Sequence, residues 1–443
     1  MKLKLFKLLN FRLIKEDMKL LSGISHSAYC SMEAFWNPKL KGKPCVVLSS
    51  NDGTIIARSA EAKLLKIPMG APLFKVQDII NKHNVHVLSS NFALYGEMSR
   101  RFHGILSGFV DPSCYSIYSI DEGFIEFTQF TKNFDAIEMA REIRHQVYKL
   151  IGLTTCVGVG RTLTESKMAN NLAKKNPELN GICNLVTMSL VDVESYYQSM
   201  PVDEIWGVGR KYAKKLNDMG ILTVLDLATS NPNRMRELFN VNMQSTILEL
   251  LGQSCFEFES SPKAKQQIVS SKSFGQKITE LSILQEAVSK YTHNAFNRLV
   301  DEHQLCGSLI VFLQSNPFDQ SKPYYSKSLT YTFTQPTNNL MQLVKAATSL
   351  IDKLYKEGIE FKKCGVMLCE LIKEEHRTIG LLTDVEQLEK EQALMTAFQS
   401  IQSKFGKAKI AAGSCNLKNR DWEPKSERQS RNYFSEAGMI VFN

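Results

Sequence analysis

Hydrophobic residues in the first half of the chain recur in both strand-like and helical patterns. Residues 43–53 are predicted as a strand that ends in an Asp-Gly turn, and a second short strand follows at 54–57. Residues 153–160 are also β-rich. Amphipathic helices are predicted within 89–109 and over 135–151, where apolar residues recur at helical spacing. Alternating elements of this kind predict an antiparallel or mixed sheet with helices on one face.

The pattern changes after Pro201, where short helices follow one another as far as about residue 259. Residues 260–267 are polar and basic and contain a proline, which is typical of a linker. A new block follows, with strands predicted near 268–274, 307–314 and 329–333 and helices near 284–302 and 339–357. Beyond Cys369 few periodic signals remain. The two blocks of strands and helices, separated by short helices and a linker, predict a multidomain α+β protein.

Two adjacent acids, Asp121 and Glu122, lie inside the apolar, strand-like run 115–127. Neighbouring side chains of a strand point to opposite faces, and both faces are apolar here. A carboxylate in such surroundings is costly unless it is paired, hydrogen-bonded or bound to a metal, and Mg²⁺ takes carboxylate oxygens as ligands. The run therefore indicates a metal site, and an edge strand with two solvated acids is the alternative.

Composition indicates an ordinary globular protein. The 443 residues are 43% hydrophobic and 22% charged, and the net charge of +9 permits a polyanionic partner. Ten cysteines without a C-x-x-C pair indicate reduced thiols in a cytoplasmic protein. Residues 1–17 carry charges too often for a signal peptide or a membrane span, so we expect no membrane association.

Five sequence segments, taken together and in this order, resemble those of a known protein family. They are Tyr29–Glu33, Asn51–Lys63, Ser119–Glu122, Gly158–Gly160 with Ser166–Lys175, and Ile205–Lys211. From about Leu20 to the C-terminus the chain resembles the Y-family translesion DNA polymerases, and within them the UmuC branch.

The resemblance implies a right-hand polymerase architecture with a C-terminal extension. Its parts are a palm (18–42 and 89–185), fingers (43–88), a thumb with a helix-hairpin-helix motif (186–262), a little finger (268–370) and a UmuC-type extension (371–443). Residues 1–17 have no counterpart in the family, so we expect an N-terminal extension outside the fold, with Met18 as the natural start.

The resemblance also assigns the catalytic site. Asp121 and Glu122 would be catalytic ligands of Mg²⁺, but a third acid of the family falls at Ile24, and residues 22–27 contain no acid. We therefore expect a weakened metal site. His26 shares a strand face with Ile24, but imidazole suits Zn or Cu better than Mg²⁺.

Substrate contacts follow in the same way. Tyr29 occupies the steric-gate position, where an aromatic ring excludes a 2′-hydroxyl, and the adjacent family aromatic is Ala28 here. Arg58, Lys63 and Lys174 are expected near the deoxynucleoside triphosphate, although both lysines could be solvated helix residues.

A second set of residues is expected to bind DNA. Gly207 and Gly209 form a Gly-x-Gly hairpin that leads into a helix, and a helix N-terminus favours a DNA phosphate. Lys211 and Lys214 add charge that binds the backbone without reading sequence.

Two functions remain open. One is a Mg²⁺-dependent polymerase that extends damaged primer-template DNA in SOS mutagenesis, with a UmuD-type subunit and RecA as partners implied by the resemblance. The other is a catalytically inactive DNA-binding paralogue in the DNA-damage response, which Ile24 favours. Residues 378–382 lack the Gln and Phe anchors of the family's clamp-binding peptide, so this segment is not expected to bind the sliding clamp.

Overall fold

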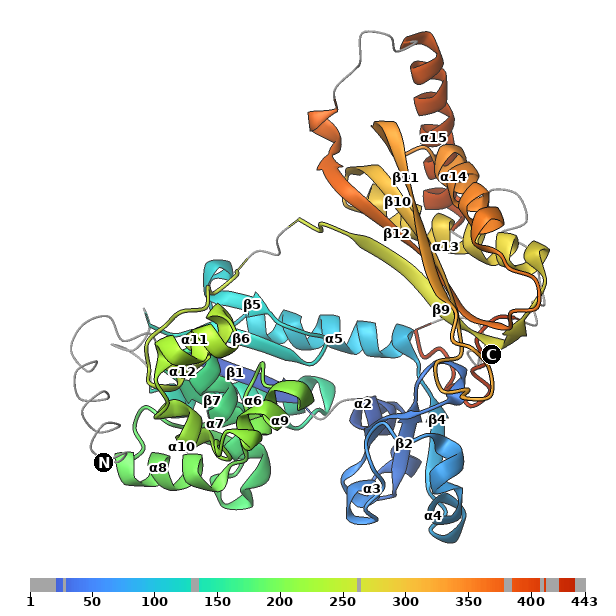
Figure 1. The fold of residues 1–443 in the computed structure, drawn as a ribbon. Coiled ribbons are helices and arrows are strands. Elements are labelled where there is room, and N and C mark those ends of the chain that lie inside the picture. Colours follow the sequence, from blue (N-terminus) through green and yellow to red (C-terminus); the bar gives the residue numbers. More distant parts are fainter. Residues whose placement is uncertain are drawn as a thin grey trace, which may run out of the picture. The chain divides into compact units, whose positions relative to one another are not determined.

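The computed structural model describes residues 21–26, 29–128, 135–260, 264–377, 385–406, 410–411 and 422–434. The chain divides into two compact units (Figure 1). The first contains Met1–Val47, Ile55–Pro262 and Arg428–Asn443, and the second contains Leu48–Thr54 and Lys263–Glu427. The expected N-terminal extension and the clamp-peptide segment lie outside the described residues. Among the described helices, none has the length and apolar character required to span a bilayer.

A five-stranded sheet in the order β5-β6-β1-β7-β8 forms the centre of the first unit. Its strands are β1 (Leu21–His26), β5 (Tyr115–Ile117), β6 (Glu122–Glu126), β7 (Thr155–Gly160) and β8 (Ile182–Asn184). Only the β7–β8 pair is parallel within this sheet. This is the mixed sheet that the sequence predicts for the palm.

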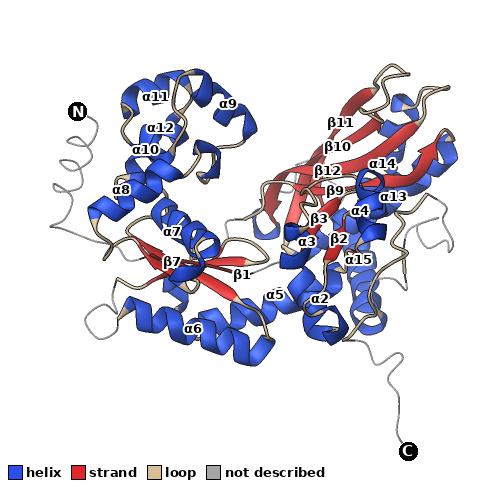
Figure 2. Cartoon of the chain, turned by 90° about the horizontal axis from the view of Figure 1, so that it is seen from below, coloured by secondary structure: helices blue, strands red, loops and turns tan. Residues whose placement is uncertain are grey.

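Helices cover both faces of the sheet, whereas the sequence analysis placed them on one face, which was wrong. Helix α7 (Leu163–Lys175) packs on one face, and α5 (Phe92–Ser107) and α6 (Ala136–Ile151) lie on the other (Figure 2). The close approach of α7 depends on glycine in β7. A Cβ added to Gly158 would lie 2.0 Å from the backbone nitrogen of Asn170.

The acidic run 115–127 is a hairpin, so its prediction as one strand was also wrong. Strands β5 and β6 pair antiparallel, with Tyr115 opposite Ile125. The backbone N–H groups of Tyr118 and Ser119 both donate to the Glu122 carbonyl, at 3.1 and 2.9 Å, and close the turn. Asp121 therefore lies in the turn, and Glu122 begins the second strand.

Apart from α2 (Tyr29–Trp36), which falls in the range predicted for the palm, the remaining elements of the first unit fall largely in the ranges predicted for the fingers and the thumb. A second sheet has the order β3-β2-β4, and its elements are β2 (Cys45–Leu48), β3 (Ile55–Arg58), α3 (Ala60–Leu64), α4 (Gln77–Lys82) and β4 (His86–Ser89). Helix α2 packs against α5. The thumb helices are α8 (Leu190–Ser199), α9 (Arg210–Asp218), α10 (Val224–Ala228), α11 (Pro232–Leu238) and α12 (Val241–Leu250). Their hydrophobic core includes apolar residues of α7, so palm and thumb pack together.

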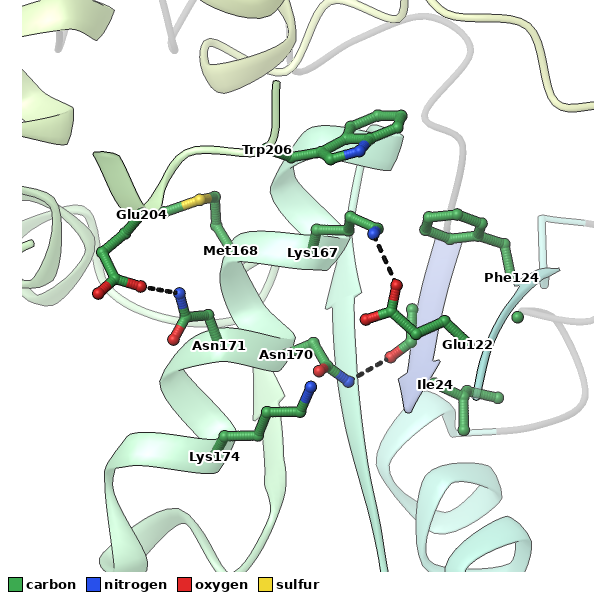
Figure 3. A pocket seen from close by; sticks show the side chains of 12 residues that line it. Ile24, Glu122, Phe124, Lys167, Met168, Asn170, Asn171, Lys174, Glu204 and Trp206 are labelled. Atoms are coloured by element: carbon green, nitrogen blue, oxygen red, sulfur yellow. Dashed lines mark hydrogen bonds and ion pairs between the residues drawn. The ribbon is translucent and has the colours of Figure 1, made fainter. Parts of the chain in front are cut away.

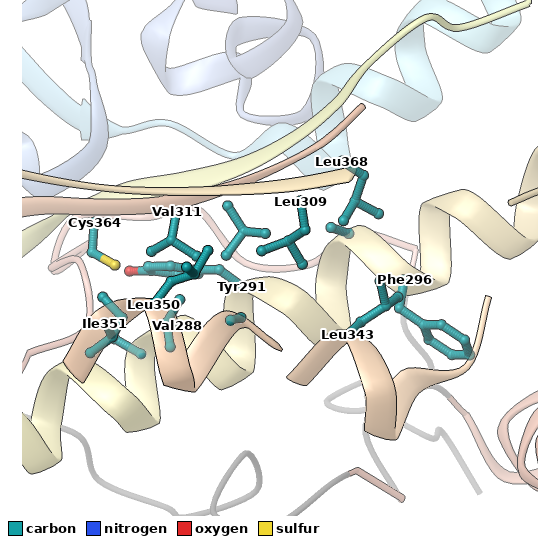
Figure 4. Close-up of a cluster of buried hydrophobic side chains, with 14 of the residues drawn as sticks. Val288, Tyr291, Phe296, Leu309, Val311, Leu343, Leu350, Ile351, Cys364 and Leu368 are labelled. Carbon is teal, nitrogen blue, oxygen red and sulfur yellow. The ribbon is translucent and has the colours of Figure 1, made fainter. Parts of the chain in front are cut away.

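The second unit contains a four-stranded antiparallel sheet in the order β11-β10-β12-β9, with two helices packed against it. Its elements are β9 (Ile268–Ile278), α13 (Leu281–Asp301), β10 (Gln304–Ser315), β11 (Ser326–Thr337), α14 (Leu340–Leu354) and β12 (Phe361–Lys373). Figure 4 shows the core between helices and sheet.

A further helix, α15 (Val385–Phe405), belongs to this unit, although the sequence pattern beyond Cys369 did not predict it. Met395 and Phe398 of α15, together with Trp422, are buried in the core of the predicted little finger.

Candidate active site of the palm

The palm contains a pocket of about 310 Å³ between the sheet, helix α7 and the start of the thumb (Figure 3). Its lining mixes charged and apolar groups. The residues that line it are Gly23, Ile24, Glu122, Gly123, Phe124, Lys167, Met168, Asn170, Asn171, Lys174, Glu204 and Trp206. The hairpin and α7 thus bring one of the two predicted acids and one predicted substrate lysine to the same pocket.

Glu122 is ion-paired to Lys167, with 2.9 Å between the carboxylate Oε2 and the ammonium Nζ. Aromatic rings surround this ammonium. It lies 3.8 Å from the ring centre of Tyr118, 5.2 Å from Trp206 and 5.8 Å from Phe124. Cation–π attraction and the ion pair both favour this position, so Lys167 provides a protein cation at the Glu122 carboxylate (Figure 3).

Asp121 does not line this pocket. Its Oδ1 accepts a hydrogen bond of 2.7 Å from the Ser119 hydroxyl within the turn. Burial raises the pKa of Tyr29, and the negative charge of Asp121 raises it further. The two predicted ligands therefore have different neighbours. Glu122 pairs with Lys167, and Asp121 acts electrostatically on Tyr29.

Ile24 lies directly opposite Gly123 and lines the same pocket as Glu122. Its side chain is only 1% exposed, so a hydrophobic group fills the place next to the acidic hairpin. The described residues contain no group of three His, Cys, Asp or Glu side chains that could hold a metal ion. This donor set does not fit a pair of Mg²⁺ ions, which would need more oxygen ligands than Asp121 and Glu122 supply. The side chain of His26 lies outside the described part of the chain.

The ring of Tyr29 is held by two aromatic residues of helix α5. It stacks on Tyr95, with centres 4.1 Å apart and planes inclined by 12°, and it meets the edge of Phe92 at 6.0 Å. The sequence has Ala28 where the family has an aromatic residue next to this tyrosine, so the sequence did not predict what packs against the ring. The ring packs against a helix more than sixty residues away in the sequence.

The three predicted triphosphate ligands occupy different places. Lys174 lines the palm pocket from the last turn of α7. Arg58 donates to the Ile67 carbonyl at 2.6 Å within the fingers, and Lys63 is exposed on α3. Neither of these two lines the palm pocket, so their role remains a prediction.

His103 is a further residue of this region that sequence reasoning missed. One ring nitrogen contacts the Tyr115 hydroxyl, and Nε2 lies 2.8 Å from the Ser119 carbonyl. Burial lowers the pKa of His103, so the neutral ring can accept from Tyr115 and donate to Ser119. His103 thereby joins the start of β5 and the acidic turn to α5. A lone histidine in a helix gives no sequence signal for this position.

The thumb hairpin presents the predicted DNA-binding residues at the surface. Gly207 has a φ of +87°, a backbone conformation that favours glycine, and a Cβ at Gly207 or Gly209 would meet nothing within 4 Å. Gly209 is the N-cap of α9 and makes no side-chain cap hydrogen bond to the first turn. Lys211 and Lys214 are exposed on the same helix.

Similar solved structures define the fold as that of the Y-family DNA polymerases. A Y-family polymerase chimera of Dbh and Dpo4 matches with a TM-score of 0.64 and 20% identity over 80% of this chain and 99% of that chain. DinB from Sulfolobus solfataricus matches with a TM-score of 0.50 and 21% identity over the same shares. The predicted right-hand architecture is therefore confirmed.

The chain belongs to the impB/mucB/samB family. The family model matches residues 25–171, its C-terminal domain matches 265–381, and the family's helix-hairpin-helix motif matches 192–221. Protein UmuC of Salmonella typhimurium is 36% identical over 92% of this chain and 96% of that protein. DNA polymerase IV of Bacillus velezensis is 22% identical over 93% and 96%. The UmuC resemblance is confirmed.

Proposed function

We propose that this protein is a UmuC-like member of the translesion-synthesis apparatus that binds damaged primer-template DNA and deoxynucleoside triphosphates. In this proposal templated nucleotidyl transfer is strongly reduced. The observation that carries it is the palm pocket, where Ile24 fills the place beside the acidic hairpin and Lys167 neutralises Glu122.

The proposal assigns each retained residue a role. Tyr29 serves as the steric gate, and Lys174, with Arg58 and Lys63 of the fingers, binds the triphosphate. Asp121 and Glu122 hold a divalent cation weakly, because two carboxylates supply few of the oxygen ligands that Mg²⁺ requires. Gly207, Gly209, Lys211 and Lys214 bind the DNA backbone through helix N–H groups and positive charge. The proposal also includes UmuD-type and RecA partners and action in the cytoplasm, which the resemblance to the UmuC branch supports.

Primer extension on undamaged and abasic templates, with and without UmuD-type and RecA partners, tests the proposal. We expect binding of primer-template DNA and of dNTP, with only trace extension. Absence of DNA binding at low salt would contradict the proposal. Robust extension that survives Asp121→Asn would place the metal site elsewhere.

The second candidate is a non-catalytic paralogue that occupies primer termini. The Lys167–Glu122 pair favours it, because a carboxylate already neutralised by a lysine has less affinity for a metal ion. This candidate predicts that the protein inhibits a UmuC-type polymerase on the same template and that the wild type shows no extension of its own. Extension by the wild type that Asp121→Asn abolishes would rule it out.

A further inference from the structure

A buried carboxylic acid lies directly behind the residue assigned as the gate. Glu33 is one helical turn after Tyr29 in α2, and its side chain is inaccessible to solvent. Its Oε1 accepts a hydrogen bond of 2.8 Å from the hydroxyl of Tyr95, the residue on which Tyr29 stacks. Burial raises the pKa of Glu33, and the hydrogen bond from Tyr95 and the nearby hydroxyl of Ser430 oppose that rise.

Ser430 belongs to a C-terminal segment, Arg428–Phe434, that packs against the first unit. Its backbone pairs with Ser89: the Ser89 N–H donates to the Arg428 carbonyl at 3.0 Å, and the Arg428 N–H donates to Ser89 Oγ at 2.9 Å. The Asn91 amide donates to the Ser430 hydroxyl at 2.9 Å. Asn91 also caps helix α5, which carries Tyr95.

Aromatic residues at the end of the segment contact both α2 and α5. Trp36, the last residue of α2, stacks on Tyr433 with ring centres 5.3 Å apart and meets the edge of Phe434 at 5.2 Å. Arg101 of α5 lies over the Phe434 ring at 5.3 Å. The segment thus contacts both α2, which carries Tyr29, and α5, which carries the ring beneath it.

We propose that the segment Arg428–Phe434 positions the steric gate. It fixes α2 against α5 through the ring contacts of Trp36 and Arg101. Through the Asn91–Ser430 hydrogen bond it also holds the start of α5, the helix that carries the ring on which Tyr29 stacks. Displacement of the segment frees Tyr29 to move and admits nucleoside triphosphates that carry a 2′-hydroxyl. This inference rests on the proposed function, since it uses Tyr29 as the gate. Ser430, Tyr433 and Phe434 are positioning residues and touch no substrate.

Two variants of the full chain test the proposal, Ser430→Ala and the double variant Tyr433→Ala/Phe434→Ala. A matched control is Phe318→Ala, because Phe318 is 88% exposed in the second unit. The first measurement is amide hydrogen exchange. We expect at least tenfold faster exchange across α2 in the double variant, with α7 unchanged. Unchanged exchange in α2 would overturn the proposal.

The second measurement is the affinity ratio between a dNTP and the matching ribonucleotide on primer-template DNA. We expect the ratio to fall at least fivefold in the double variant and less in Ser430→Ala, toward the value of Tyr29→Ala. An unchanged ratio despite faster exchange would overturn the gate role and leave a packing role alone. If the wild type binds no nucleotide, the proposed function fails, and the exchange of α2 still decides whether the segment holds that helix.

Discussion

The side chain at position 24 is the residue on which the chemistry of the palm depends most. Ile24 is buried against the acidic hairpin, so an aspartate there would be a buried charge unless a cation neutralised it. We therefore expect Ile24→Asp to lower the free energy of unfolding by about 2 to 4 kcal/mol without metal. Thermal unfolding with and without Mg²⁺ checks this, and the ion should stabilise the variant more than the wild type.

The same substitution should raise primer extension above the trace level of the wild type. An added carboxylate improves the position of the reacting groups, and misplacement alone costs about 10²-fold in rate. Asp121→Asn in both backgrounds is the control and should abolish whatever extension Ile24→Asp restores. Equal extension by the wild type and Ile24→Asp would contradict the alignment of β1.

Lys167 provides an independent test at the other carboxylate. Lys167→Met keeps the aliphatic stem among the aromatic rings and removes the charge that neutralises Glu122. A partly buried ion pair of this kind contributes about 1 kcal/mol, so affinity for Mn²⁺ should rise about fivefold. Electron paramagnetic resonance measures the affinity for Mn²⁺, with Lys175→Met as the matched control. Lys175 lies on the same helix as Lys167 and forms an ion pair with Glu204. A rise of equal size in the control would show a general charge effect.

The pH dependence of stability tests the buried acid behind the gate. Burial raises the pKa of Glu33 above its usual value of 4.5, so the folded state holds the proton more tightly than the unfolded chain. Its contribution is fully present below about pH 4.5 and is lost as the pH rises through the folded pKa. The stability of Glu33→Gln relative to the wild type should therefore increase over this pH range. Urea unfolding of both proteins between pH 4 and pH 7, values chosen to bracket this range, measures the difference. A difference that does not vary with pH would contradict the prediction.

At the scale of elements, the sequence predicted what depends on strong local periodicity. Helices α6, α13 and α14 and the strands β9, β10 and β11 of the second unit lie close to their predicted ranges, whereas β12 was not predicted. The hairpin 115–127 was mistaken for one strand because its turn contains no glycine or proline and its apolar residues continue through it. Helix α15 was missed because only a narrow stripe, including Met395 and Phe398, is buried.

The residues of the candidate site divide in the same way, into those that a local motif predicts and those that only contacts between distant elements identify. Asp121, Glu122, Tyr29 and Lys174 were predicted from short motifs in the local sequence. Lys167, His103 and Tyr95 were missed as functional partners because their importance comes from contacts between distant elements, which one sequence does not reveal. Ile24 was found only because a motif set the spacing.

The junction between α7 and the thumb provides a prediction for these elements. Glu249 of α12 is completely buried, and its carboxylate accepts backbone N–H groups of Thr164, Cys255 and Phe256 at 2.8 to 3.0 Å. Glu249→Ala leaves these donors without their acceptor, so we expect a loss of about 3 kcal/mol in the free energy of unfolding. Chemical denaturation measures it, with exposed Glu237→Ala as the control. A loss below that of the control would show that solvent replaces the carboxylate.

At the scale of the molecule, charge predicts how DNA binding responds to salt. Binding of primer-template DNA should weaken steeply with salt and show no sequence preference, because neutralised phosphates release counterions. The double variant Lys211→Ala/Lys214→Ala should reduce the slope of log K against log salt by about two units. Fluorescence anisotropy measures the slope, and Lys149→Ala on α6 is the control. Salt-independent binding, or a slope unchanged in the double variant, would contradict the role of the hairpin.

The path of the chain has a consequence for limited proteolysis. The chain leaves the first unit at Pro262 and returns to it at Arg428, so most of the second unit is an insertion with both ends tied to its host. A single cut at the first crossing leaves the C-terminal fragment attached through Arg428–Phe434, whose hydrogen bonds and ring contacts belong to the host. A nicked molecule should therefore migrate as the intact protein under native conditions and separate into two bands only in denaturant.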